Sequence, residues 1–172
     1  DFQKDLNKHY ADSTSSPLKK EDLKVFQSLD FFPASADFFV QATFIRTEKE
    51  KPFKMPTTTD RKPLYVKYGE LHFTVNSTKC KLNVYQNVEF SKKPGYKDDL
   101  FLPFTDLTSG VESYGGGRYI DLKIQEGEDW VIDFNQAYNP YCAYNEKYSC
   151  PIPPQENDLK VAIKAGVKKF HD

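Results

Sequence analysis

Two cysteines within a proline- and tyrosine-rich stretch are the first candidates for chemistry in this sequence. Cys142 and Cys150 lie within residues 129–157 and are separated by seven residues. A disulfide between them would close a small loop, would stabilise the fold by about 2–3 kcal/mol and would need an oxidising compartment. A structural zinc site needs four Cys or His ligands, but the three histidines are scattered along the chain. We therefore expect no metal at these cysteines.

Cys142 is also the candidate nucleophile of an enzyme. A nucleophilic thiol needs a nearby base, such as a histidine, or a lowered pKa. No local motif supplies that base, so two packed thiols or a structural disulfide is the simpler interpretation. We expect no cofactor, and the sequence identifies no catalytic residues.

Polar side chains around two predicted strands form a second candidate set. Asp121 and Asp133 could share a sheet face if their strands are neighbours, and paired carboxylates can divide acid and base roles by splitting their pKa values. Such side chains also bind backbone groups, so they could equally anchor a proline-rich loop to a sheet. The candidate ligand-binding residues are Arg118, Asp121, Asp133, Asn135, Tyr138, Asn139, Cys142, Tyr144, Glu156 and Asn157.

Arg118 follows three glycines and has the strand phase of the inward-facing residues. A buried arginine needs a carboxylate partner, and the candidates are Glu112, Asp121 and Glu156. Successive glycines can bind an anion through their backbone amides, but a phosphate loop joins a strand to a helix and usually carries a lysine. We interpret residues 115–117 as a bend that positions Arg118.

Four tyrosines give the long loop a set of amphipathic rings. Aromatic side chains belong to a core more often than to a site, but on an irregular loop they can also form the wall of a carbohydrate or other ligand site. We expect the site where residues 106–118 and 135–157 converge. The four tyrosines are Tyr138, Tyr141, Tyr144 and Tyr148, and Tyr114 and Tyr119 would lie beside them in such a wall.

The elements that must position these residues are mostly strands. Aromatics make up 15% of the chain, an excess that favours β structure. Alternating or continuous apolar residues predict a series of strands, which we expect to form one antiparallel sheet. These strands cover residues 37–46, 100–104, 118–122, 130–135 and, as the last one, 159–165.

Residues 71–85 predict a hairpin, and the alternation over residues 64–75 predicts a bulge just before it. Apolar residues occupy even positions before Gly69 and odd positions after it. A strand with a period of two cannot bury both sets on one face without a shift, so we expect a bulge at Gly69. We expect a turn at residues 76–78. In this register Cys80 faces the core and His72 faces away.

Two short helices are predicted before the strands. Phe2, Leu6 and Tyr10 recur every four residues, which gives a first helix one apolar stripe. A second helix is predicted from Pro17 to about Leu29. These helices could pack on the strands or could grip a partner, and the sequence leaves both open.

Length and charge limit the organisation and the partners. A chain of 172 residues fits one domain, with a helical arm over residues 1–30 and a β-rich body over residues 37–172. The net charge of −1 argues against nucleic acid as the main partner. No apolar run approaches the roughly 18 residues of a membrane span. No signal peptide is present, as in a mature exported protein or a trimmed chain, and we slightly favour a periplasmic or cell-envelope location.

Several motifs resemble one family, known as domain of unknown function 1684. The most specific is NP-x-CAY-x5-CP-x-PP-x-EN, which begins at Asn139, and TDLTSGVESYGGGRYIDL begins at Thr105. SPLKKEDLKVFQSLDFFP resembles the N-terminal segment of the family, and YVKYGELHFTVN resembles its central hairpin. The resemblance covers essentially the whole chain. It implies prokaryotic, bacterial relatives, some of them exported or lipoprotein-like, but it implies no substrate or catalytic residue.

We predict an α+β, mostly β fold, in which a curled antiparallel sheet, barrel-like or a sandwich, follows short N-terminal helices. The leading functional hypothesis is non-catalytic binding of a small or carbohydrate-like ligand, which predicts a pocket lined by Tyr and Asn with no strongly perturbed titratable group. A hydrolase-like enzyme using a carboxylate or Cys142 would instead place two polar groups in contact, one with a shifted pKa. A structural or accessory protein of the cell envelope would show an exposed apolar patch and no pocket.

Overall fold

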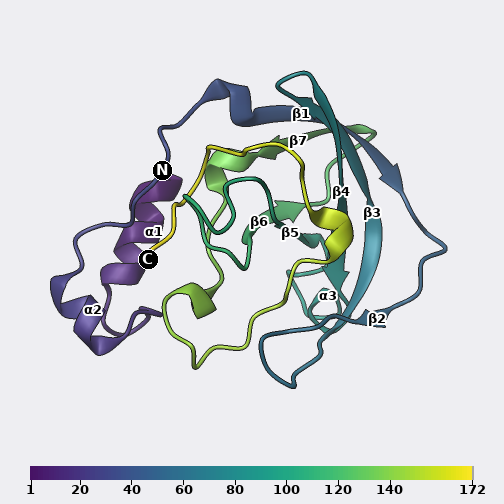
Figure 1. Cartoon of the computed structure of the whole chain (residues 1–172). Helices are drawn as coiled ribbons and strands as arrows, with labels where there is room; N and C mark the ends of the chain where they lie inside the picture. The colour runs from purple at the N-terminus through teal and green to yellow at the C-terminus, as the bar shows by residue number, and fades with distance from the viewer. Residues whose placement is uncertain (172) are drawn as a thin grey trace.

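A curled antiparallel sheet forms the body of the computed structural model, which describes residues 1–171 (Figure 1). Its strands are β1 (Phe39–Arg46), β2 (Phe53–Lys54), β3 (Leu64–Val75), β4 (Thr78–Asn87), β5 (Asp99–Phe104), β6 (Arg118–Lys123) and β7 (Asp129–Asp133). They lie in the order β6-β5-β4-β3-β1-β7, and β2 pairs with β3 outside this path. The sheet bends into a half-barrel, which confirms the predicted mostly β fold with few short helices.

The helices lie at the N-terminus and in the connections between strands. None of them, within the described chain, is long and apolar enough to cross a membrane. They are α1 (Phe2–Ala11), α2 (Lys20–Val25) and α3 (Val88–Ser91), with single 3₁₀ turns at Ala36–Phe38, Phe134–Gln136, Tyr141–Ala143 and Gln155–Asn157.

The first predicted helix is confirmed, and the second is shorter than predicted. α2 begins later than Pro17 and ends at Val25 rather than near Leu29. Phe26 adopts extended backbone, and the Leu29 N–H donates to the side chain of Asn7 over 2.7 Å. The polypeptide therefore leaves the helix because an α1 side chain takes a backbone group that a longer α2 would need.

The β3–β4 hairpin follows the prediction closely. The register shifts between Lys67 and Gly69, which is the expected bulge. Gly69 is required there, because a Cβ atom would clash with the ring of Phe44. At the turn, Asn76 and Ser77 have φ angles of 48° and 64°, as the tight turn of a two-residue hairpin demands.

The last predicted strand is wrong, although its alternating burial is real. Leu159 and Ile163 are buried, but residues 159–165 belong to no strand of the described chain. The Leu159 N–H donates to the Thr105 carbonyl over 2.8 Å, and the Ile163 N–H donates to the Asp106 carboxylate over 2.7 Å. A loop carbonyl or a side chain satisfies a buried backbone group as well as a neighbouring strand does.

The inner face of the half-barrel holds the main core. Trp130 of β7 stacks on Phe44 of β1 with ring centroids 3.9 Å apart. β6 and β7 lie at opposite ends of the sheet, so Asp121 and Asp133 are not on neighbouring strands. A smaller apolar cluster around Tyr10 packs the N-terminal arm onto the body.

Candidate functional site

A groove lined with aromatic rings lies on the side of β6 that faces away from the main core. Its cavity volume is about 420 Å³, which is within the range of small-molecule sites. It is bordered by β6, by α1 and by the segment that contains both cysteines. We call it the tyrosine groove, and its principal residues are Tyr10, Tyr119, Asp121, Tyr138, Tyr141 and Tyr148.

The alternation of side chains along β6 decides which residues reach this groove. Arg118 and Ile120 point inward, so Tyr119 and Asp121 point to the opposite face. The backbones of Tyr119 and Tyr138 pair through two N–H···O bonds of 2.9 and 3.0 Å. This pairing places Tyr138 beside Asp121, and its hydroxyl donates a 2.7 Å hydrogen bond to the carboxylate.

Asp121 supplies a carboxyl group to a largely aromatic surface. Neighbouring side chains desolvate it and so raise its pKa, although one side stays open to solvent, and the hydrogen bond from Tyr138 opposes this shift. Burial also raises the pKa of Tyr138, and the nearby Asp121 carboxylate adds to the effect. The pair therefore presents an acceptor beside a hydroxyl that stays protonated at neutral pH.

α1 closes one side of the groove. Tyr10 is fully buried, and its hydroxyl has no hydrogen-bond partner among residues 1–171. Its ring packs edge-on against Tyr144 with centroids 5.0 Å apart. Nearby, His9 Nε2 lies 3.1 Å from the hydroxyl of Tyr141. Because the whole side chain is buried, Tyr10 supports the wall of the groove and presents no exposed hydroxyl to a ligand.

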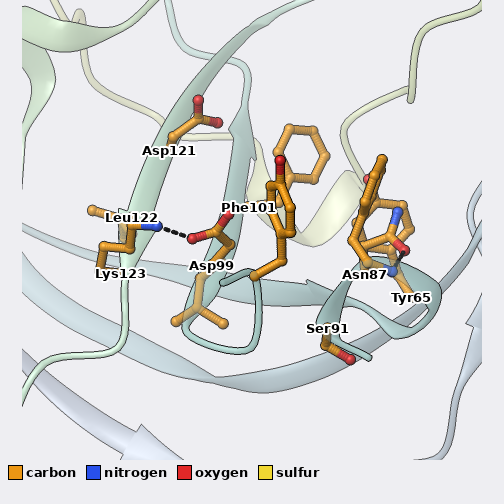
Figure 2. A pocket seen from close by; sticks show the side chains of 11 residues that line it. Tyr65, Asn87, Ser91, Asp99, Phe101, Asp121, Leu122 and Lys123 are labelled. Atoms are coloured by element: carbon orange, nitrogen blue, oxygen red, sulfur yellow. Dashed lines mark hydrogen bonds and ion pairs between the residues drawn. The ribbon is translucent and has the colours of Figure 1, made fainter. Parts of the chain in front are cut away.

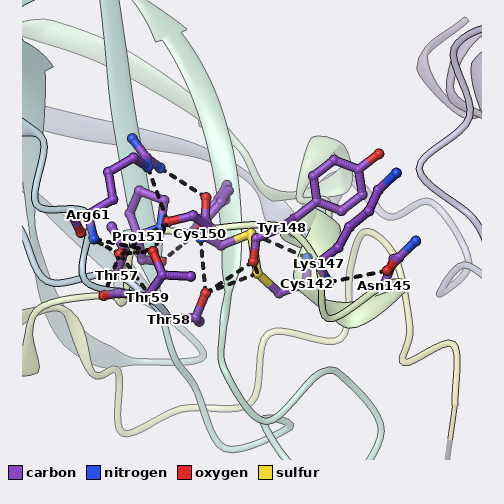
Figure 3. The surroundings of a disulfide bond; sticks show 12 residues. Thr57, Thr58, Thr59, Arg61, Cys142, Asn145, Lys147, Tyr148, Cys150 and Pro151 are labelled. Carbon is purple, nitrogen blue, oxygen red and sulfur yellow. Dashed lines mark hydrogen bonds between the residues drawn. A yellow bond between two sulfur atoms is a disulfide. The ribbon is translucent and has the colours of Figure 1, made fainter.

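Cys142 and Cys150 form a disulfide that shapes the wall of the groove (Figure 3). Thr58 holds this segment through two bonds: its N–H donates to the Cys150 carbonyl over 3.0 Å, and its hydroxyl accepts the Cys150 N–H over 3.2 Å. A disulfide sulfur is not a thiolate, so Cys142 could act as a nucleophile only after reduction. Within residues 1–171, no group of three His, Cys, Asp or Glu side chains could hold a metal ion.

Arg118 is buried and hydrogen-bonds to the C-terminal segment. It does not line the tyrosine groove. Its guanidinium donates to the carbonyls of Ile163, Ala165 and Val167, with distances of 2.8 Å to the first and 3.1 Å to the last. Its Nη2 lies 3.4 Å from the Asp106 carboxylate. Burial lowers the pKa of Arg118, and Asp106 opposes that shift. These contacts satisfy backbone carbonyls that a strand over residues 159–165 would have paired with a neighbouring strand.

The carboxylate partners predicted for Arg118 are wrong, because Asp106 takes that role instead of Glu112, Asp121 or Glu156. The 106–117 loop also does not line the tyrosine groove. It packs on the C-terminal segment, where the Leu107 N–H donates to a carbonyl of that segment over 3.0 Å.

Three other candidate residues are buried and form hydrogen bonds that hold parts of the fold together. Asn157 donates to the carbonyls of Asn83 and Pro103 over 2.9 and 2.7 Å, and its side-chain oxygen accepts the Asn83 N–H over 2.9 Å. Asn139 donates to the hydroxyl of Tyr144 over 3.1 Å. Burial raises the pKa of Tyr144 to about 12. These residues anchor the proline-rich segment, as one of the two interpretations of the polar set anticipated.

Asp133 and Asn135 lie at the end of β7 and fix the start of the chain's first strand. Asn135 accepts the Ser35 N–H over 3.0 Å and donates to the Ser35 carbonyl over 2.9 Å. Asp133 accepts the Asn135 N–H over 3.0 Å. Glu156 is exposed in the last 3₁₀ turn. None of these three residues lines the tyrosine groove.

The structure therefore brings together only part of the predicted set. Asp121 and Tyr138 line the groove, and the disulfide borders it. Tyr119, which the sequence analysis set beside the four tyrosines, lines the groove as well. Sequence reasoning missed Tyr10, because only the packing of α1 brings it to the groove.

A second groove, which we call the β5 groove, shares Asp121 with the tyrosine groove (Figure 2). Its cavity volume is also about 420 Å³. Phe101 and Tyr65 present their rings to it, and Lys123 pairs with Asp99 at its edge. The two grooves therefore adjoin at a shared carboxyl group.

Comparisons with other proteins place the chain among uncharacterised relatives. A family model described as "protein of unknown function (DUF1684)" matches residues 24–168. An uncharacterised protein of Haloarcula marismortui, whose solution NMR structure was a structural genomics target, is 31% identical in sequence with a TM-score of 0.75. That similarity covers 96% of this chain and 89% of the other. No curated protein matches the chain.

Proposed function

The chain belongs to the DUF1684 family of proteins of unknown function, and we propose that it binds a small carbohydrate-like ligand in the tyrosine groove without converting it. The hydrogen-bonded pair of Tyr138 and Asp121 within a wall of rings carries this proposal. The two residues come from segments whose backbones pair directly, so the geometry of the pair is rigidly supported.

A sugar suits the chemistry of this groove. Its C–H faces can pack on aromatic rings, and its hydroxyls can donate to a carboxylate and accept from tyrosine hydroxyls. Within the described chain, the carboxylate of Asp121 accepts one hydrogen bond, from Tyr138, which leaves acceptor capacity for a ligand.

A hydrolase is the second candidate, because the contact between Asp121 and Tyr138, both with raised pKa values, is the arrangement predicted for an enzyme. Desolvation raises the pKa of Asp121, and Asp99 on the adjacent strand adds to the shift. A carboxyl group with a raised pKa beside a second carboxylate is the arrangement from which a glycosidase obtains its general acid. The solvent-open side of Asp121 favours binding over catalysis, since hydrolases usually enclose such a group.

A cell-envelope location fits the same proposal. The disulfide between Cys142 and Cys150 persists in oxidising compartments, which include the periplasm and the cell surface. This supports an exported protein, as does a carbohydrate ligand. A purely structural envelope protein is less well supported, because such a protein needs no ring-lined groove.

Calorimetric titration with cellotetraose and chitotetraose tests the proposed function. We expect Asp121→Asn and Tyr141→Ala to weaken binding by about tenfold or more, because each removes a polar or aromatic contact. Phe39→Ala and Asp129→Asn are matched controls on β1 and β7, where both side chains are exposed, and should bind normally.

Two outcomes would count against binding without conversion. Absence of binding to both tetramers, or equal binding by the groove variants, would contradict a carbohydrate site here. Shortened oligomers after incubation, detected by mass spectrometry and abolished by Asp121→Asn, would instead support the hydrolase.

A further inference from the structure

We propose that the ligand is an extended neutral glycan chain that occupies the tyrosine groove and the β5 groove together, with Asp121 at the junction. The inference rests on the proposed function and makes it more specific. A glycan that crosses both grooves is a polymer or a long oligomer, whereas either groove alone would take a short fragment.

An unbroken row of aromatic rings joins the two grooves. Tyr65 lies 5.5 Å from Phe101, Phe101 lies 4.6 Å from Tyr119, and Tyr119 lies 5.8 Å from Tyr138, all measured between ring centroids. These rings come from β3, β5, β6 and the segment paired to β6. Tyr65 and Tyr119 are buried and Phe101 and Tyr138 are half-buried, so the row forms a continuous aromatic floor beneath the two grooves. Such a floor matches a ligand that repeats along its length.

The outer end of the β5 groove has rings that are unusually open to solvent. Phe90 is 50% exposed and Tyr96 is 47% exposed, with centroids 6.0 Å apart. Both residues line the β5 groove. Exposed rings beside a groove are expected where a ligand covers them. The Phe90–Tyr96 pair would therefore contact the part of the glycan that is farthest from Tyr141.

Charge at the β5 groove favours a neutral chain. Lys123 and Asp99 form an ion pair at its edge, so each neutralises the other there. Single-stranded nucleic acid also stacks on rings, but it needs a row of unpaired cations along its backbone, whereas this end of the groove offers Lys93, whose ammonium lies 4.7 Å from the Phe90 ring centroid. A polyanionic glycan would need them too. The shared Asp121 adds a further acceptor for hydroxyl groups.

Titration with a length series tests this proposal. The probes are the dimer, tetramer and hexamer of both the cello- and chito-oligosaccharide series, titrated into the full chain. We expect the hexamer to bind about tenfold more tightly than the dimer, because only the hexamer reaches both grooves. Phe90→Ala should remove this gain while leaving the dimer affinity unchanged. Tyr141→Ala should weaken all lengths.

Phe39→Ala is the matched control for Phe90→Ala, because both rings are about half exposed. Thermal unfolding should show that both variants fold. Equal affinity for dimer and hexamer, with Tyr141→Ala weakening both, would overturn the extended site but leave the proposed function intact. Full hexamer affinity in Phe90→Ala would also overturn it. Absence of binding at every length would overturn both proposals.

Discussion

The hydroxyl of Tyr138 donates a 2.7 Å hydrogen bond to Asp121, across two segments whose backbones pair two residues away at Tyr119. The bond favours the ionised carboxylate, while desolvation favours the neutral acid. The protonation state of Asp121 therefore depends on the balance between these two effects.

Tyr138→Phe should raise the pKa of Asp121 further, because it removes the bond to the charged form and leaves the desolvation in place. Titration of the side-chain carboxyl carbon by NMR measures this pKa directly. Tyr148→Phe is the control, since the Tyr148 hydroxyl does not bind Asp121 in the described chain. An unchanged or lowered pKa in Tyr138→Phe would contradict the role assigned to the bond.

Glu70 should make stability depend on pH. The ammonium of Lys67 lies 2.6 Å from its carboxylate and, with His72, lowers its pKa to about 2. The unfolded value is higher, so the stabilisation is present above that value and is lost as the pH falls toward the folded pKa.

Glu70→Gln should therefore lower the free energy of unfolding at neutral pH by about 1 kcal/mol. Urea unfolding at several pH values would show the difference from the wild type shrinking as the medium becomes acidic. Glu48→Gln alters an exposed carboxylate and serves as the control. A difference that stays constant with pH would exclude an electrostatic origin.

Arg118→Lys should destabilise the fold by about 3–5 kcal/mol, because a lysine cannot reach three carbonyls and Asp106 at once. The lost contacts would leave the buried Asp106 carboxylate without a cation and several buried backbone carbonyls without a donor. Urea unfolding measures the change. Arg46→Lys, at an exposed arginine that donates to the Tyr68 carbonyl, should cost less than about 1 kcal/mol. Similar costs for the two variants would refute the structural role of Arg118.

Asn157→Ala should destabilise the fold by about 3 kcal/mol, because it leaves the Asn83 N–H and two carbonyls unpaired in the interior. The side chain joins β4 to β5 near the one place where they pair, Tyr85 with Phe101. Thermal unfolding should show the loss. Gln155→Ala, at an exposed neighbour, should have little effect.

Replacing Cys142 and Cys150 together by serine should lower the free energy of unfolding by about 2–3 kcal/mol, because the unfolded chain gains freedom. Cys80→Ser is the control, since Cys80 is outside the disulfide. The intact mass of the native protein should be lower than the reduced mass by two hydrogen atoms. A native protein with three free thiols would contradict the bond.

Local patterns predicted the hairpin, the bulge and the first helix, because each depends on neighbouring residues. The shift of apolar phase at Gly69 and the two turn residues at 76–77 determine the hairpin without help from the rest of the chain. The last strand failed for the opposite reason. The predicted alternation of buried and exposed residues was correct. However, such a pattern does not show whether the backbone carbonyls of this segment pair with a neighbouring strand or accept from the guanidinium of Arg118.

The site was only partly predictable for the same reason. Alternation on β6 placed Asp121 on the outer face and Arg118 on the inner one, as the sequence indicated. Nothing near Arg118 identified Asp106 as its partner, because the two residues meet only when the loop between them folds back on the C-terminal segment.

By itself, the sequence determined the strand-rich fold class, the phase of β6 and of the hairpin after Gly69, and the family, because these depend on residue type and spacing. Only the tertiary structure decided that Tyr138 lies beside Asp121, that α1 brings Tyr10 to the same groove and that Asp133 lies elsewhere. Such contacts join residues far apart in the chain. They depend on how the sheet curls and which segments cover it, and no local period carries that information.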